Sequence, residues 1–220
     1  MPVKELERLV SRYHRAGFQL ALHGNGDAAI DAIIEALAMA QAEYPRQDTR
    51  HFVVHAQTIR PDQLASLSRL HVGVSFFPTH TYYWGDWYST RVFDDARARQ
   101  ISPLAIADEL GVRYTIHSDA PVTPVSPMQM LWSAVNRRTL SDVQLGPNLV
   151  VSRMRALRAM TIDAAWQNHL DSDRGSLEVG KLADVISLSD NPLLANDVRA
   201  INVSQVWIGG IERYRRGSLN

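Results

Sequence analysis

The residues of this chain that could do chemistry are histidines and an aspartate placed where predicted strands end. His23 closes one apolar run, and His55 lies near the end of the next. A further strand pattern runs directly into His117 and Asp119. In parallel α/β folds the carboxyl ends of the strands meet on one face, where ligands bind. Imidazoles and a carboxylate suit a divalent metal, and we expect His23, His55 and Asp119 to lie within about 6 Å of one point.

Such a metal can lower the pKa of bound water to about 7 and make hydroxide available as a nucleophile. Each position also has a structural interpretation. A single histidine near a strand end is more often a hydrogen-bonded polar residue than a ligand, and Asp119 could stabilise a turn. Asp27 precedes a predicted helix, where capping is its favoured role. The combination favours a site, because every strand expected to end on that face has a polar candidate there, His80 included. The other histidines are expected away from it, on the surface for His14, His71 and His169.

A run of aromatic residues follows His80 and is predicted to be a long loop. Its members are Tyr82, Tyr83, Trp84, Trp87 and Tyr88. These rings could form the wall of a binding pocket or simply pack the loop. We expect the loop to cover the site, because loops on this face carry specificity.

The elements that position these residues alternate between strands and helices. Apolar runs predict four strands, at residues 19–23, 52–56, 72–77 and 112–116, separated by segments with helical periodicity. This alternation predicts parallel pairing with right-handed crossovers. A doubly wound open sheet and a (β/α)8 barrel both fit the pattern, although a barrel needs eight such units.

The last fifty residues have a different pattern. Residues 184–188 and 203–208 read as strands, and Gly209-Gly210 is a hairpin signal before the next apolar position. We therefore divide the chain into an α/β region, residues 1–170, and a small β element, residues 171–220.

Composition excludes several classes of function. Basic and acidic residues balance at 23 each, so no strong field favours nucleic acid or an anionic membrane. The chain has no cysteine, which excludes thiolate zinc sites and disulfides. No apolar run is long enough to span a membrane. The first residues are charged throughout, unlike a secretory signal, so we expect a cytoplasmic protein.

Five segments are specific in combination: LALHGNGDAAID, HFVVHAQ, FFPTHTYYWGDW, YTIHSDAPVTP and GSLEVGKLADVISLSDNPL. In this order they resemble the amidohydrolase superfamily, in the subgroup that includes N-substituted formamide deformylases. The resemblance extends over residues 5–214. It implies the carboxyl-terminal half of a TIM-like (β/α)8 metal-dependent hydrolase barrel. Residues 1–170 would supply units 5–8, and residues 171–220 would supply the last strands of a small β-sandwich.

The resemblance also implies roles for individual residues. His23 and His55 match metal ligands on strands 5 and 6, and Asp119 matches the strand-8 aspartate that contacts metal and moves the proton of the attacking water. The implied cofactor is a divalent metal, with zinc favoured. The implied partner is a small amide-like substrate, which His80, Trp84, Trp87 and His117 would contact.

The implied reaction is hydrolysis of a carbon–nitrogen bond other than a peptide bond. Asp119 would take the proton of the water and give it to the leaving nitrogen. Two alternatives remain open. The same scaffold could hydrolyse esters or phosphoesters, because fold does not fix substrate. The chain could also be a non-catalytic half-barrel that serves as an interaction module.

The sequence departs from the family pattern in ways that favour the second alternative. No two histidines are two residues apart, so the His-x-His pair of strand 1 has no counterpart, and the strand-4 lysine or glutamate has none either. At His117 the family often has a small residue. We therefore expect this chain alone to bind metal weakly and to hydrolyse negligibly. A monomer that keeps zinc and cleaves amides would mean that His80 or His117 replaces the missing ligands.

Half a barrel would leave two open strand edges, which invite pairing. Val54, Val74 and Ile116 would face the missing half and be exposed. We therefore expect either a homo-oligomer or a chain that lacks its amino-terminal half.

Overall fold

The computed structural model of this chain describes residues 1–217. Its elements, in chain order, are α1 (Val3–Arg15), β1 (Ala21–Gly24), α2 (Asp27–Glu43), β2 (Phe52–His55), α3 (Pro61–Arg69), β3 (Gly73–Phe76), α4 (Thr79–Trp87), the π-helix η1 (Tyr88–Val92), α5 (Asp95–Arg99), α6 (Leu104–Glu109), β4 (Tyr114–Ile116), α7 (Pro127–Asn136), the 3₁₀ helix η2 (Pro147–Leu149), α8 (Arg153–Met160), α9 (Ile162–Gln167), β5 (Val185–Leu188), the 3₁₀ helix η3 (Val198–Ala200), β6 (Val203–Ile208) and β7 (Ile211–Arg215).

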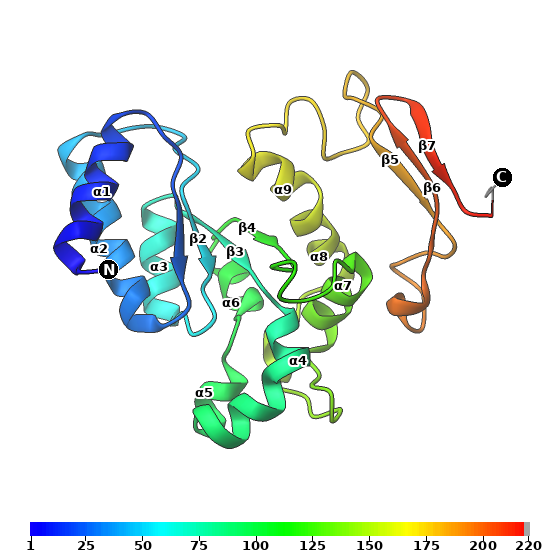
Figure 1. Cartoon of the computed structure of the whole chain (residues 1–220), viewed down its shortest axis with the longest axis horizontal. Coiled ribbons are helices and arrows are strands. Elements are labelled where there is room, and N and C mark those ends of the chain that lie inside the picture. Colours follow the sequence, from blue (N-terminus) through cyan, green and yellow to red (C-terminus); the bar gives the residue numbers. More distant parts are fainter. Residues whose placement is uncertain (218–220) are drawn as a thin grey trace.

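Strands β1 to β4 form a parallel sheet in chain order, with helices between consecutive strands (Figure 1). The predicted α/β organisation with parallel pairing is therefore confirmed. The strand order runs without the reversal that creates the crevice of a doubly wound sheet. All four strands consequently present their carboxyl ends on one side, as the sequence predicted.

The two faces of this sheet are buried to different degrees. We expected Val54, Val74 and Ile116 to be exposed, and for two of them this was wrong: Val74 is fully buried and Ile116 nearly so. Alternate residues of a strand share a face, so Val74 lies with Phe76, and Phe76 is the register partner of Ile116. That face carries the hydrophobic core, which includes Val53. Val54 lies on the opposite face and is half-buried.

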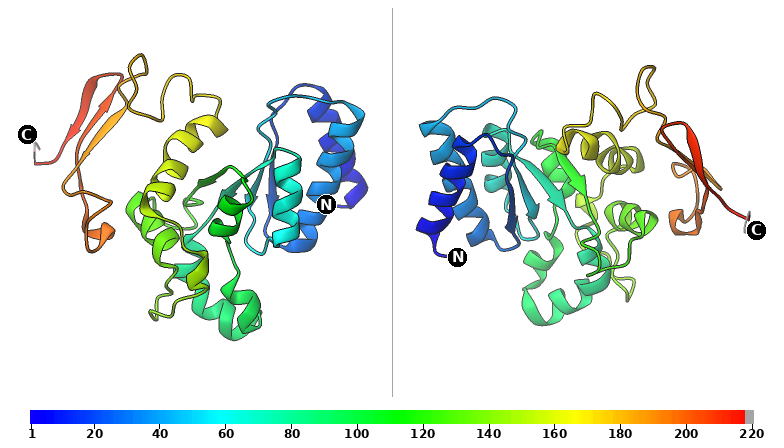
Figure 2. Two further views of the ribbon diagram at one scale, coloured as in Figure 1. Left: turned by 180° about the vertical axis from the view of Figure 1, so that it is seen from behind. Right: turned by 45° about the horizontal axis from the view of Figure 1, so that its top comes forward.

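The tail of the chain forms a separate antiparallel sheet in the order β5, β6, β7. Gly209 and Gly210 join β6 to β7 with φ values of 58° and 77°, the positive values that a tight hairpin needs. This sheet lies at the opposite end of the molecule from α1 (Figure 2). Ile186 and Tyr214 remain about half exposed on it. Among the described residues, no helix has the length and apolar character needed to cross a membrane.

Two predicted elements differ from the structure. The aromatic segment predicted to be a loop is helical, because α4 covers Thr79–Trp87 and η1 continues to Val92. The aromatic residues of this segment recur at helical spacing, but the sequence there has no periodic row of aliphatic residues that would predict a helix. The sequence of residues 152–169 predicts one continuous helix, but the structure divides this segment at Thr161 into α8 and α9. The chain packs back there: a side chain on Gly175 would meet the Cβ of Ala165 at 2.6 Å.

The expectation that His14 lies on the surface was also wrong, because its side chain is buried against His51. The backbone N–H of Leu20 donates to Nδ1 of His51 at 3.0 Å, so the proton of a neutral His51 is on Nε2. That N–H donates to Nδ1 of His14 at 2.9 Å. Nε2 of His14 then donates to the carbonyl of Tyr44 at 2.8 Å. These hydrogen bonds thus join α1 to the end of α2 and the start of β1.

This pair predicts a pH-dependent stability. Burial lowers the pKa of His51 from 6.5 to about 4. As the pH falls from 6.5 to 4, His51 therefore takes up a proton in the unfolded chain but not in the folded one, which favours unfolding. The wild-type free energy of unfolding should therefore fall by about 3 kcal/mol more than that of His51→Gln between pH 7 and pH 4. Urea titrations at several pH values measure this difference. His169→Gln, at an exposed histidine, is the control. Parallel pH profiles for the wild type and His51→Gln would contradict the prediction.

Candidate metal centre

Three side chains with metal-binding atoms meet at the carboxyl end of the parallel sheet. In the part of the chain that the structure describes, His55, His117 and Asp119 form the one group of three whose possible ligand atoms all lie within 4.8 Å of one another. His55 is buried, and the other two are partly buried. They come from the ends of β2 and β4, which are separated in the sheet by β3.

The backbone leaves extended geometry where these residues occur. His55 pairs in register with Phe76, so alternation alone would direct its ring toward the helices. His55 instead has φ of 71°, and Asp119 has φ of 52°. Residues other than glycine rarely take this left-handed conformation. The ring of His55 consequently lies 5.0 Å, centroid to centroid, from the ring of His117.

A chain of hydrogen bonds holds the two rings. Nε2 of His117 lies 3.1 Å from Nδ1 of His55, and Nδ1 of His117 lies 2.9 Å from the hydroxyl of Ser75. The hydroxyl of Thr115 is 3.0 Å from that of Ser75 and donates to Oε1 of Gln167 at 2.7 Å. Ser75 and Thr115 are register partners on the face opposite the hydrophobic core. The site is therefore supported by polar residues from β3, β4 and α9.

Burial keeps the imidazoles of this site uncharged at neutral pH. It lowers the pKa of His117 to about 4 and that of His80 to about 3, with neighbouring histidines adding to the effect. Burial also lowers the pKa of His55, and the charge of Asp119 opposes that shift. A neutral imidazole keeps a lone pair on one ring nitrogen, which is what a metal ligand needs.

Aromatic rings close one side of the group. Phe77 is fully buried and stacks on His117 with ring centroids 5.4 Å apart. His80 lies 4.1 Å from Phe77 and 6.0 Å from His55. The ring of Trp84 is 5.7 Å from that of His80, one helical turn away on α4. Nδ1 of His80 is buried and has no hydrogen-bond partner among the described residues, so a donor or acceptor for a ligand remains there.

The structure does not bring all the predicted residues equally close. The ring of His23 is 4.8 Å from that of His55, but His23 is exposed on edge strand β1 and lies outside the group of three. Trp87 is 54% exposed and contacts Tyr88. His117, predicted to contact substrate, is hydrogen-bonded to His55.

Sequence reasoning missed Ser75 and Phe77. A serine inside an otherwise apolar strand was the available signal for Ser75. Nothing in the pattern distinguished Phe77 from a core residue.

The donor set fits a divalent metal. Two neutral imidazoles and a carboxylate are the ligands of a borderline ion such as zinc, and three protein ligands are common in catalytic zinc sites. Because the chain has no thiolate, metals that require sulfur are a poor match.

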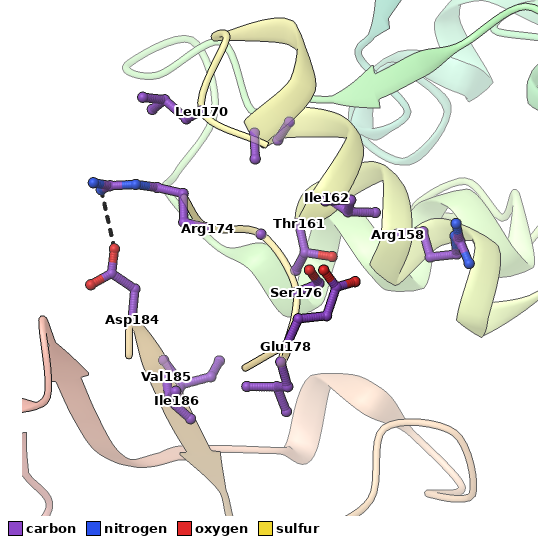
Figure 3. Close-up of a pocket in the computed structure, with 14 residues that line it drawn as sticks. Arg158, Thr161, Ile162, Leu170, Arg174, Ser176, Glu178, Asp184, Val185 and Ile186 are labelled. Atoms are coloured by element: carbon purple, nitrogen blue, oxygen red, sulfur yellow. Dashed lines mark ion pairs between the residues drawn. The ribbon is translucent and has the colours of Figure 1, made fainter. Parts of the chain in front are cut away.

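A cavity of about 780 Å³ lies away from this group, between α8, α9 and the start of the carboxyl-terminal sheet (Figure 3). Its walls include Ile162, Leu170 and Ile186. Arg174 and Asp184 form an ion pair across it at 3.1 Å. It contains no histidine, so it lacks the ligand set of the metal centre.

Comparisons with known proteins show which family the chain is similar to. A sequence model of the amidohydrolase family matches residues 1–214. The chain is 28% identical to an N-substituted formamide deformylase of Arthrobacter pascens, over 96% of this chain and 39% of the relative. It is 24% identical to an imidazolonepropionase of Treponema denticola, over 99% of this chain and 46% of the relative. The chain thus spans less than half the length of these curated relatives.

The chain is also similar to part of longer proteins of known structure. An uncharacterized metal-dependent hydrolase from Pyrococcus horikoshii is 25% identical with a TM-score of 0.76, over 90% of this chain and 39% of that chain. An uncharacterized metal-dependent hydrolase from Pyrococcus furiosus is 27% identical with a TM-score of 0.74, over 88% of this chain and 38% of that chain.

The stacking of Phe77 on His117 predicts how the site titrates. Because burial holds the pKa of His117 at about 4, Phe77→Ala should admit water and raise that pKa toward 6.5. Imidazole nitrogen shifts, recorded by NMR across pH in the presence of a chelator, measure it. Phe93→Ala removes a ring that stacks on Tyr88 instead and is the control. An unchanged pKa in Phe77→Ala would show that this ring does not keep the site dry.

Proposed function

Since the chain belongs to the amidohydrolase family, we propose that it carries part of the metal-binding face of a hydrolase that cleaves carbon–nitrogen bonds other than peptide bonds. The observation that carries this proposal is the group formed by His55, His117 and Asp119 at the carboxyl ends of parallel strands. In barrel enzymes this end of the strands is where active sites lie. The neutral imidazoles and the adjacent aromatic wall further support a ligand site there.

The fold proposal follows from the strand order. Residues 1–170 would be units 5–8 of a TIM-like (β/α)8 barrel, with β1 to β4 as consecutive barrel strands. Residues 171–220 would supply the last strands of a small β-sandwich. The consecutive parallel order and the TM-score of 0.76 to a metal-dependent hydrolase support this proposal.

The family pattern proposes His23, His55 and Asp119 as the residues that would hold a divalent metal, with zinc favoured. Such a metal supplies Lewis acidity and lowers the pKa of water. His23 lies next to His55 and on the side of the sheet from which a ligand could join the group. Its exposure at the edge strand leaves its ring free to turn.

Asp119 would move the proton in the reaction. Its carboxylate takes one proton from water as the water oxygen bonds to the substrate carbon. The same proton then goes to the leaving nitrogen as the carbon–nitrogen bond breaks, so an amide and water give a carboxylic acid and an amine. Asp119 has a positive φ, and its carbonyl accepts from the N–H of Val122 at 2.8 Å, so this turn would hold the carboxylate in one direction.

His80 and Trp84 would position the substrate. Nδ1 of His80 has no partner among the described residues and is available for one hydrogen bond to a polar group of the substrate. The ring of Trp84 lies beside it and offers an apolar surface. A small amide with one apolar substituent matches this combination of groups.

A substrate panel tests the activity. The turnover of the 220-residue chain, loaded with zinc, should be low, because the His-x-His pair has no counterpart in it. Amides or formamides should nevertheless be hydrolysed faster than esters and phosphoesters of similar size. Asp119→Asn should lower kcat/KM at least about 100-fold, because positioned proton transfer contributes that much. Asp142→Asn, at a carboxylate whose side chain is 79% exposed, is the matched control. Preferred cleavage of esters or phosphoesters would assign the scaffold to another hydrolysis. Zinc binding without turnover of any substrate would favour the interaction module.

Trp84 and Trp87 provide a second test, on substrate preference. Trp84→Ala should change the ratio of kcat/KM between a bulky and a small amide by about 10-fold, because an apolar contact discriminates to that extent. Trp87→Ala should change it less, since Trp87 is 54% exposed and contacts Tyr88. Thermal unfolding of both variants separates specificity from stability. Equal changes in the ratio would assign both rings to the pocket.

A further inference from the structure

We propose that His117 is itself a ligand of the metal, in one set with His55 and Asp119. The inference rests on the proposed metal-dependent function and adds to it a ligand that the family pattern does not predict. In that pattern the position of His117 is often a small residue, whereas here it carries an imidazole that belongs to the group.

Distances support this ligand set. The possible ligand atoms of His55, His117 and Asp119 lie within 4.8 Å of one another. The closest pair of ring nitrogens, Nε2 of His117 and Nδ1 of His55, is separated by 3.1 Å. Two ligand atoms bound about 2.1 Å from a tetrahedral zinc lie about 3.4 Å apart. The two nitrogens therefore need only a small shift to share one ion.

The hydrogen-bond chain behind His117 fixes its tautomer. Oε1 of Gln167 can only accept, so the single hydroxyl proton of Thr115 is donated to it. The bond between the hydroxyls of Thr115 and Ser75, 3.0 Å long, must then use the proton of Ser75. With its own proton committed, Ser75 accepts from Nδ1 of His117 at 2.9 Å.

This assignment leaves Nε2 of His117 with a lone pair directed at the group. A histidine that binds a metal through one nitrogen almost always donates its other N–H to a fixed acceptor. Ser75, Thr115 and Gln167 form such a support, and all belong to regular elements of the fold. His23 has no comparable support, since no hydrogen bond from its ring is found within residues 1–217.

The packing around His117 keeps the lone pair of Nε2 directed at the group. Phe77 stacks on the ring with an interplanar angle of 20° and limits its rotation. The ring therefore keeps the orientation in which Nε2 faces Nδ1 of His55 at 3.1 Å.

The competing role for His117 is purely positional. With a proton on Nδ1 of His55, the 3.1 Å contact would be a hydrogen bond that orients His55. His55 would then bind metal through Nε2, and His117 would not touch the ion. Loss of His117 would weaken metal binding in both cases, so affinity alone does not separate the two roles. The number of imidazoles bound to the metal does separate them.

The test is X-ray absorption at the zinc edge, combined with calorimetric titration of Zn²⁺ into the metal-free chain. His117→Ala should bind zinc with one imidazole fewer than the wild type and at least 100-fold more weakly. Ser75→Ala should keep the imidazole count and lose about 10-fold in affinity, as a supporting residue does. His169→Ala, at an exposed histidine, is the control and should match the wild type.

The outcomes distinguish this inference from the proposed function. An unchanged imidazole count in His117→Ala would overturn the ligand role and leave the metal-dependent function in place. A wild-type chain that binds no zinc would overturn both. Circular dichroism checks that each variant is folded. If His117→Ala does not fold, His117→Gln, which keeps a hydrogen-bonding group near Ser75, replaces it and should show the same loss of one imidazole.

Discussion

In the parallel sheet, each strand directs side chains alternately to the helices and to the opposite face, and the register aligns them in rows across the sheet. Val53, Val74 and Tyr114 form one such row, which is fully or almost fully buried in the hydrophobic core. Burial of this row sets the orientation of the strands. The residue that follows each member of the row must then lie on the opposite face of the sheet. Ser75 and Thr115 occupy that second row, and they are the residues that support the metal centre.

The buried polar groups of the metal centre need hydrogen-bond partners. A buried polar group without a partner costs about 1–3 kcal/mol, so several buried imidazoles and hydroxyls need a connected set of donors and acceptors. The chain from Gln167 to His117 supplies one, with each proton used once. Nδ1 of His80 is an exception, because it is buried without a partner among the described residues. Exceptions of this kind in a folded protein are expected at functional sites.

The sequence predicted the strands more accurately than the site. Apolar runs bounded by turn residues located β1 to β4 within two residues, and β6 was predicted with its observed bounds. The orientation of His55 could not be predicted, because no residue pattern signals a positive φ at a histidine. The helix α4 could not be predicted from hydrophobic periodicity, because its inward positions are aromatic and polar, His80 and Trp84 among them. The tautomer of His117 depends on Gln167, fifty residues away in sequence, and only the fold brings the two together.

Gln167 also connects the metal centre to the other end of the sheet. Its backbone carbonyl accepts from the side chain of Gln19 at 2.7 Å, and the carbonyl of Trp166 accepts from Arg50 at 2.7 Å. Gln19 and Arg50 precede β1 and β2, so the end of α9 is tied to the entry of both strands. The side chain of Gln167 meanwhile receives the proton of Thr115. A shift of α9 would therefore remove the acceptor at the end of the hydrogen-bond chain, and His117 would lose the partner arrangement that fixes its lone pair.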